Sequence, residues 1–436
     1  MAQKSGELST LLRLGAGFGH GPRSELVYRK CIAQYPEDFR AYFNLASQLA
    51  GQPTKQEEAV QLLEEANRLA PHVVEVYANL AGLQIKRGRA AEAAEWCERG
   101  LTLDPGNSEC LYNLNVALRQ EGRMREALER SWERLGHLLS SSSSSSSAEK
   151  SEDSLPRSPQ PPPLAQAASA IKAPLDPALD VAFVCVKWGT KYGSEYVNAL
   201  YGGLQRHYWS CPHYPSQSQP LLVCLTDDPS GVRPEVQVSL LPDSSTSAWR
   251  GWWLKGHLFG NWVDALLPAA PTTFVFLDLD TVLCGPLRPC IEPLVRKAIQ
   301  TGAVLSLQAG QFKASEGRDE GINSSILVWR NDSSTSSLFG FLEKHYQAVT
   351  SVVYKFDHYL EMMLLSHTRH VAVDEAWPCP PFIYVPNEQG AIVDFSSLSG
   401  TDRALPPNAA IVCFPLLPKP HQVAESVPWI KEHWKP

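Results

Sequence analysis

Short apolar runs alternate with longer amphipathic stretches in the second half of the chain. Five runs have the length and the branched or aromatic content of buried strands: 181–186, 221–225, 273–277, 303–307 and 325–329. Helical patterns lie between them at 194–207, 252–267 and 292–300. Because strands and helices alternate in this way, the pattern predicts an α/β domain built on a single doubly wound mixed sheet.

The first part of the chain has a different periodicity. Pro36, Pro71 and Pro105 are 35 and 34 residues apart, and the same residue types return between them. Three positions repeat in step: Tyr42, Tyr77 and Leu111; Leu45, Leu80 and Leu114; Ala59, Ala93 and Ala127. This pattern resembles the tetratricopeptide repeat, whose period is about 34 residues.

The resemblance implies an all-α domain of paired antiparallel helices, which stack because one pair is too small to bury its own apolar face. We expect this repeat domain at residues 23–137, behind an N-terminal tail at 1–22. Such arrays present a concave surface to a protein or peptide partner. The alternative interpretation is a spacer that only positions the following domain.

A segment of low complexity separates the two patterns. Eight consecutive serines at 140–147 are followed by acidic residues and by five prolines between 156 and 163. Such a segment cannot bury enough apolar area to offset the entropy of its chain. We therefore predict a disordered Ser/Pro-rich linker at 138–178 and the α/β domain at 179–436.

Composition narrows the choice of partner and compartment. The formal net charge of −7 gives no basic footprint for nucleic acid or for an anionic membrane. No apolar run reaches the 18 residues or so of a membrane span, and residues 1–25 lack the apolar core of a signal peptide. The ten cysteines form no zinc-binding spacing. These features favour reduced thiols in the cytoplasm or an organellar stroma.

Two acids one residue apart follow the strand predicted at 273–277. Asp278 and Asp280 would lie at the carboxyl end of that strand, where open α/β sheets bind their ligands. In an extended segment their side chains point the same way, so both carboxylates can face one Mg²⁺ or Mn²⁺ held together with substrate phosphates. The doublet alone also fits a phosphatase nucleophile loop of the haloacid dehalogenase type, or a solvated loop.

Six blocks of sequence give a more specific indication. They occur in this order: CVKWGTKYGSEYVNALYGGL (185–204), CLTDDPSG (224–231), GWWLK (251–255), FLDLDTV (276–282), GINSSILVW (321–329) and PKPH (418–421). Together they resemble the A-type nucleotide-sugar transferase fold, in a group similar to family 8 glycosyltransferases, over residues 179–436. In dehalogenase-type phosphatases the acidic strand normally opens the domain, whereas two strand–helix units precede it here.

The resemblance implies a role for each matched residue. Contacts with the base and ribose of a nucleotide fall to Thr190, Lys191, Tyr192 and Asp227, and contacts with the diphosphate to Lys255 and Lys419. Contacts with donor or acceptor hydroxyls fall to Asn323 and Ser324. By the same resemblance, Asp278 and Asp280 would hold the Mn²⁺ or Mg²⁺ that bridges the diphosphate.

Two departures from the family pattern affect the metal and acceptor assignments. Pro415 stands where the family carries a metal-binding histidine, and His421 is the nearby residue that could replace it. The family's Gly-Asp-Gln segment is replaced by Lys-Phe-Asp-His, which leaves Asp357 as the candidate for the acceptor side. We expect a metal-dependent glycosyltransferase that uses a nucleotide diphosphate sugar. A non-catalytic repeat scaffold that carries a degenerate transferase domain is the alternative.

Overall fold

The computed structural model describes most of the chain in two compact units. The described residues are 2–19, 21–143, 181–210, 221–241, 249–260, 262, 273–316, 318–353, 355–369, 380–385, 387, 390–400 and 403–436. The first unit comprises 1–135, 308–322 and 344–371, and the second comprises 136–307, 323–343 and 372–436. Most of the predicted linker lies outside the described residues, and only 138–143 are seen, at the end of a helix.

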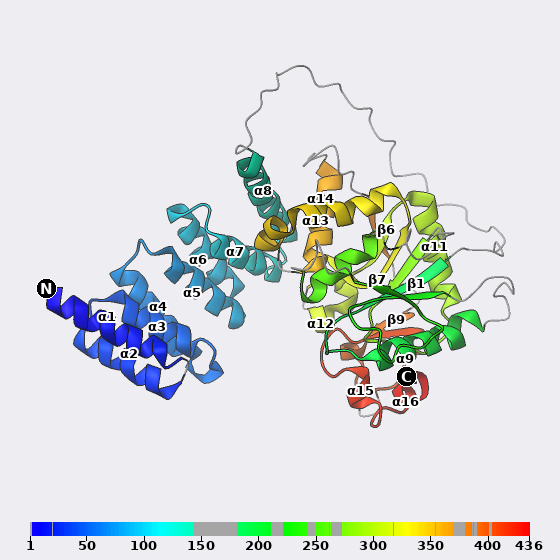
Figure 1. The fold of residues 1–436 in the computed structure, drawn as a ribbon, viewed down its shortest axis with the longest axis horizontal. Coiled ribbons are helices and arrows are strands. Elements are labelled where there is room, and N and C mark those ends of the chain that lie inside the picture. The colour runs from blue at the N-terminus through cyan, green and yellow to red at the C-terminus, as the bar shows by residue number, and fades with distance from the viewer. Residues whose placement is uncertain are drawn as a thin grey trace, which may run out of the picture. The chain divides into compact units, whose positions relative to one another are not determined.

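The described part of the first unit is mainly helical (Figure 1). Two of its residues, Gln308 and Ile322, belong to strands. The helices of the N-terminal half are α1 (Ala2–Gly17), α2 (Pro22–Gln34), α3 (Phe39–Leu49), η1 (Pro53–Lys55), α4 (Gln56–Leu69), α5 (Val74–Lys86), α6 (Ala90–Leu103), α7 (Ser108–Gln120) and α8 (Met124–Ser143). Helix α1 lies where we expected a tail, and its Leu8 and Leu12 are buried. The pairs α3–α4, α5–α6 and α7–α8 correspond to the three units of the sequence pattern.

The repeated residues of this unit have repeated contacts. Tyr77 Oη donates to the carbonyl of Pro71 at 2.8 Å, and Tyr42 Oη donates to the carbonyl of Pro36 at 3.1 Å. The periodic alanines are fully buried where helices meet, because a small side chain lets two backbones approach closely. Gly88 adopts a positive φ of 72° in the turn that follows α5, a backbone region that favours glycine.

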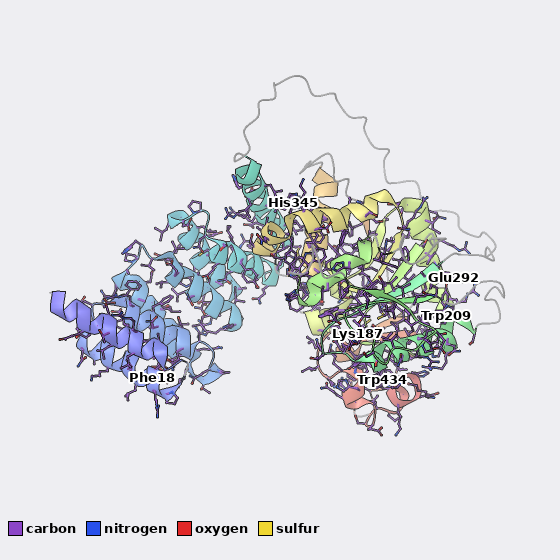
Figure 2. All side chains as sticks on the ribbon, viewed as in Figure 1. Phe18, Lys187, Trp209, Glu292, His345 and Trp434 are labelled. Atoms are coloured by element: carbon purple, nitrogen blue, oxygen red, sulfur yellow. The ribbon has the colours of Figure 1, made fainter. Side chains whose placement is uncertain are left out.

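Two segments from the second half of the sequence also belong to the first unit. They contain η4 (Ala309–Phe312), α12 (Lys313–Glu316) and α14 (Phe356–Arg369). Helix α13 (Ser333–Val352) begins in the second unit and ends in the first. His345, labelled in Figure 2, lies next to this boundary. Its backbone angles φ −119° and ψ 20° are not helical.

The second unit is built on a seven-stranded mixed sheet. Its strands are β1 (Val181–Lys187), β2 (Leu222–Thr226), β3 (Gln237–Leu240), β4 (Thr273–Leu277), β6 (Val304–Gln308), β7 (Ile322–Arg330) and β8 (Phe382–Val385), in the order β3-β2-β1-β4-β7-β6-β8. Strands β1, β2, β3 and β4 are parallel, and β7 runs antiparallel to β4. All five predicted strands are present, and β4 is buried throughout because it lies inside the sheet.

A small second sheet extends the fold beyond the two acids. It consists of β5 (Thr281–Leu283), β9 (Ile392–Asp394) and β10 (Ile411–Cys413), in the order β5-β10-β9. The remaining helices are α9 (Ser194–Leu204), η2 (Gln205–Trp209), η3 (Gly251–Phe259), α11 (Arg288–Thr301), η5 (Phe395–Ser397), α15 (Pro420–Val423) and α16 (Pro428–His433). The helix predicted at 252–267 begins as the 3₁₀ helix η3, and most of its second half lies outside the described residues.

Candidate functional site

The two acids lie where the chain leaves the large sheet and enters the small one. The backbone N–H of Asp278 donates to the carbonyl of Ser325 in β7 at 2.9 Å. The carbonyl of Asp280 accepts from the backbone N–H of Phe414, just after β10, at 3.0 Å. Each acid is therefore fixed to a different sheet through its backbone, which holds the side chains at the carboxyl end of β4.

Asp278 is paired with a lysine from another element. Lys255 Nζ, in η3, donates to Asp278 Oδ2 at 2.7 Å and to Ser324 Oγ at 3.1 Å. The Lys255 side chain is 10% exposed and that of Asp278 is 22% exposed, so solvent still reaches the pair. The structure thus brings together three of the predicted site residues, from η3, β4 and β7.

Asp280 is paired in the same way with a second lysine. Lys419 Nζ donates to Asp280 Oδ2 at 2.6 Å, and Tyr192 Oη donates to the same oxygen at 2.8 Å. The ammonium group of Lys419 also reaches the backbone carbonyls of Phe414 and Pro415. Burial and the negative charge of Asp280 both raise the pKa of Tyr192, so its hydroxyl remains a donor at neutral pH.

His421 takes part in a different contact. Its Nδ1 shares a hydrogen bond with the hydroxyl of Tyr196, whose ring packs against Tyr192 with centroids 4.8 Å apart. Trp434, labelled in Figure 2, makes an edge contact with the Tyr196 ring at 5.4 Å between centroids. In the part of the chain that the structure describes, no three His, Cys, Asp or Glu side chains are placed to hold one metal ion. His421 therefore does not complete a three-ligand group with the two acids.

The loops that follow β1 and β2 are tied together. The backbone N–H of Gly189 donates to Asp227 Oδ2 at 2.8 Å. Thr190 and Lys191 follow in the same loop with exposed side chains. Lys191 Nζ lies 4.9 Å from the centre of the Tyr192 ring. Because β1, β2 and β4 are parallel, these loops emerge at the same sheet edge as the two acids.

Asn323 and Asp357 are the two remaining predicted site residues. Asn323 is buried at the start of β7, and its Oδ1 accepts from the backbone N–H of Ser325 at 3.0 Å. Asp357 belongs to α14 in the first unit, where it lies 3.4 Å from Lys355 Nζ. Sequence reasoning does not single out Tyr196, although its spacing of four residues from Tyr192 is a weak signal of their edge-to-face contact.

The donor set at Asp278 and Asp280 suits a hard cation together with a phosphorylated ligand. Two carboxylates are a common protein contribution to Mg²⁺ or Mn²⁺ when phosphate oxygens and waters complete the coordination. Both carboxylates are now balanced by lysine ammonium groups, so the four side chains sum to no net charge. If a diphosphate bound the two ammonium groups, the two carboxylates would become available as ligands of the cation.

The first unit carries a groove of about 400 Å³ on its repeats. Its lining is mostly small or polar and includes Ser47, Ala78, Asn79, Gly82, Lys86 and Asn113. These residues come from α3, α5 and α7, the first helices of the three repeated pairs. Side chains of this size and polarity allow close approach of an extended main chain.

Comparisons with known proteins bear on the first unit. Residues 56–101 match the tetratricopeptide repeat family. The human protein O-mannosyl-transferase TMTC3 is 28% identical over 99 residues, which are 23% of this chain and 11% of that protein. The chain thus spans about a tenth of the length of this relative. No helix in the described ranges has the length and apolar character needed to cross a membrane.

Solved structures give distant likenesses. A crystal structure of MamA is 20% identical, with a TM-score of 0.30 over 31% of this chain and 81% of that one. YrrB, described as a TPR protein with an unusual peptide-binding site, is 19% identical, with a TM-score of 0.25 over 28% of this chain and 61% of that one. The sequence match at 56–101 confirms that this chain contains tetratricopeptide repeats.

Proposed function

We propose that residues 179–436 form a glycosyltransferase domain that moves a sugar from a nucleotide diphosphate sugar to an acceptor. In the same proposal, the tetratricopeptide repeats recruit a protein or peptide partner, or the acceptor itself. The observation that carries the proposal is the convergence of Asp278, Asp280, Lys255 and Lys419 at the carboxyl end of β4. These residues come from three distant parts of the sequence.

Charge supports a diphosphate ligand at this site. Lys255 and Lys419 provide two ammonium groups in a partly buried setting, where a charged contact is stronger than in water. A bound Mn²⁺ or Mg²⁺ would supply charge neutralisation for the departing nucleotide diphosphate. Asp278 and Asp280 would hold that ion, and the hydroxyl of Tyr192 orients the Asp280 carboxylate.

The sheet supports a nucleotide at the neighbouring loops. Open α/β sheets bind ligands outside the carboxyl ends of their strands, and the loops after β1 and β2 leave the sheet there. Tyr192 offers a ring on which a base can stack, and Thr190 and Asp227 offer polar groups nearby. Asn323 and Ser324, near the start of β7, would contact sugar hydroxyls, and the hydrogen bond from Lys255 to Ser324 supports this role.

A second candidate function is a scaffold that binds through its repeats without catalysis. The observation that favours it is the pairing of each acid with an internal lysine, which already satisfies both charges. Pro415 also offers no side-chain ligand where the family pattern has a histidine. Under this hypothesis the partner binds in the groove that α3, α5 and α7 line together with Leu63 of α4 and with Thr350 and Ser351 of α13.

Hydrolysis of a panel of UDP- and GDP-sugars tests the transferase proposal. We expect the full chain to hydrolyse one of them slowly with Mn²⁺, and Asp280→Asn to reduce this turnover by about 100-fold, as when one group is removed from an electrostatic catalytic site. Asp319→Asn is the matched control, because its carboxylate is 71% exposed and lies in the first unit. Equal turnover by the two variants would refute the site. Calorimetry that shows no heat with any donor, with or without Mn²⁺, would favour the scaffold.

A further inference from the structure

A buried carboxylate in the first unit accepts hydrogen bonds from three donor groups. Glu361, in α14, is 1% exposed and accepts from Arg119, from Arg318 Nη1 at 2.7 Å and from the backbone N–H of Ile322 at 2.8 Å. Burial alone would raise the pKa of Glu361, but the charges of Arg119 and Arg318 outweigh it and lower the pKa. The carboxylate therefore stays ionised and keeps all three contacts.

Arg119 is held in place by the last repeated helix pair. Its side chain is 4% exposed, and its Nε donates to Asn115 Oδ1 at 2.7 Å. The amide nitrogen of Asn115 in turn donates to the carbonyl of Ala127 in α8 at 2.9 Å. Helix α8 also contacts α14 directly, since Trp132 Nε1 donates to the carbonyl of Met362 at 2.6 Å. The position of Glu361 thus depends on the repeats.

The contact between Glu361 and Ile322 lies at the start of β7. Ile322 is the first residue of that strand, and Gly321 precedes it with a φ of 104°. A Cβ on Gly321 would lie 2.4 Å from Glu361 Oε1, so glycine is what lets the chain approach the carboxylate. Ser324, which accepts from Lys255 at 3.1 Å, follows Ile322 by two residues in the same strand.

The fully buried ion pair between Arg119 and Glu361 contributes little net stability to the contact between their two helices. Desolvation of both charges offsets most of their attraction, and apolar residues of similar volume are often as stable. What the pair adds is a fixed orientation of the Glu361 carboxylate, because Arg119 binds Oε2 while Arg318 and the backbone N–H of Ile322 bind Oε1. Removing Arg119 takes away the contact at Oε2 and leaves Glu361 paired with Arg318 alone.

We propose that Arg119 and Glu361 are positioning residues through which the last repeat fixes the start of β7, and with it Asn323 and Ser324. The effect on donor binding rests on the proposed transferase function, whereas the effect on the strand does not.

Hydrogen exchange on the full chain tests whether Arg119 stabilises the start of β7. In Arg119→Met we expect the amide of Ile322 and its neighbours up to Ser325 to exchange about tenfold faster, with β1 and β2 unchanged. Arg119→Lys keeps a positive charge and should restore much of the protection. Arg123→Met is the control, since the Arg123 side chain is 46% exposed and pairs with Glu121 and Glu126, two partly exposed acids of the first unit. Unchanged exchange at Ile322, or faster exchange in β1 and β2 alike, would overturn the proposal.

Titration of UDP and Mn²⁺ into the same variants tests the link to the site. We expect Arg119→Met to weaken binding about tenfold, which corresponds to 1.4 kcal/mol, and Arg123→Met to leave it unchanged. Unchanged binding in Arg119→Met would overturn the link. If Arg119→Met does not fold, the double variant Arg119→Met/Glu361→Gln removes both buried charges and is measured in its place. A wild-type chain that binds no nucleotide refutes the transferase function, while the exchange result still decides the positioning role.

Discussion

His257 makes the stability of the second unit dependent on pH. It lies in η3, two residues after Lys255, and its ring packs against Trp249 and Phe339 with centroids 4.8 and 5.6 Å away. The side chain is 4% exposed, and among the described residues its Nε2 has no hydrogen-bond partner. Burial lowers the pKa of His257 from 6.5 to about 4, because the charged ring would lose its hydration.

The direction of the effect follows from proton binding. Between pH 4 and pH 6.5 the unfolded chain binds a proton at His257 that the folded protein does not, so stability rises with pH in this window. The contribution is complete above about pH 6.5 and is lost as the pH falls toward 4. Between pH 7.5 and pH 5 the loss from this residue is about 2 kcal/mol.

His257→Phe isolates this contribution. Phenylalanine keeps the ring between Trp249 and Phe339, removes the titration and removes a buried nitrogen that has no partner, so we expect unchanged or slightly greater stability at pH 7.5. At pH 5 its advantage over the wild type should grow by about 2 kcal/mol, measured as the change in free energy of unfolding from urea midpoints. Phe259→Leu, in the same helix, should change the free energy of unfolding by the same amount at pH 7.5 and at pH 5. Parallel pH profiles for His257→Phe and wild type would refute the reasoning.

Two further predictions concern the repeats. An ideal Cβ on Gly100 would lie 2.7 Å from Cys110 Sγ and 3.1 Å from Tyr77 Cβ, so we expect Gly100→Ala to lower the free energy of unfolding by about 1–3 kcal/mol in urea denaturation. Gly136→Ala, where a Cβ meets nothing, should be neutral or stabilising, and equal losses at both sites would contradict the packing argument. Burial raises the pKa of Cys110 to about 11, so we expect no alkylation of Cys110 by iodoacetamide in the native protein at pH 7.5. Modification detected there by mass spectrometry under native conditions would show that the helices open.

Local periodicity was sufficient to predict most of the secondary structure. The run at 273–277 could be identified as a buried strand because β4 has neighbours on both sides and needs apolar residues on both faces. The repeats could be recognised from the sequence because the same residue types make the same contacts in successive units, as the hydroxyls of Tyr42 and Tyr77 do. In both cases the physical cause lies within a few residues of the pattern.

Long-range pairings could not be predicted in this way. Arg119 and Glu361 are 242 residues apart, and no local pattern marks either as a partner of the other. The assignment of α14 to the first unit therefore has no sequence signal that we could use. His421 illustrates the same limit within the site. It follows Lys419 closely in sequence, yet its ring nitrogen bonds with Tyr196.

Because Asp278 and Asp280 are each paired with a lysine, a substitution of Asp280 has different effects on nucleotide binding and on turnover. The Lys419 side chain is 6% exposed and forms an ion pair with Asp280. A diphosphate can therefore bind the Lys419 ammonium group only if another cation then neutralises the Asp280 carboxylate. Neutralising Asp280 releases Lys419 for phosphate without need of a metal ion, so Asp280→Asn can retain nucleotide while it loses turnover. The presence of both acids is therefore compatible with a scaffold as well as with an enzyme, and it is turnover by the wild type and its loss in Asp280→Asn, more than the affinity of either protein, that decide between them.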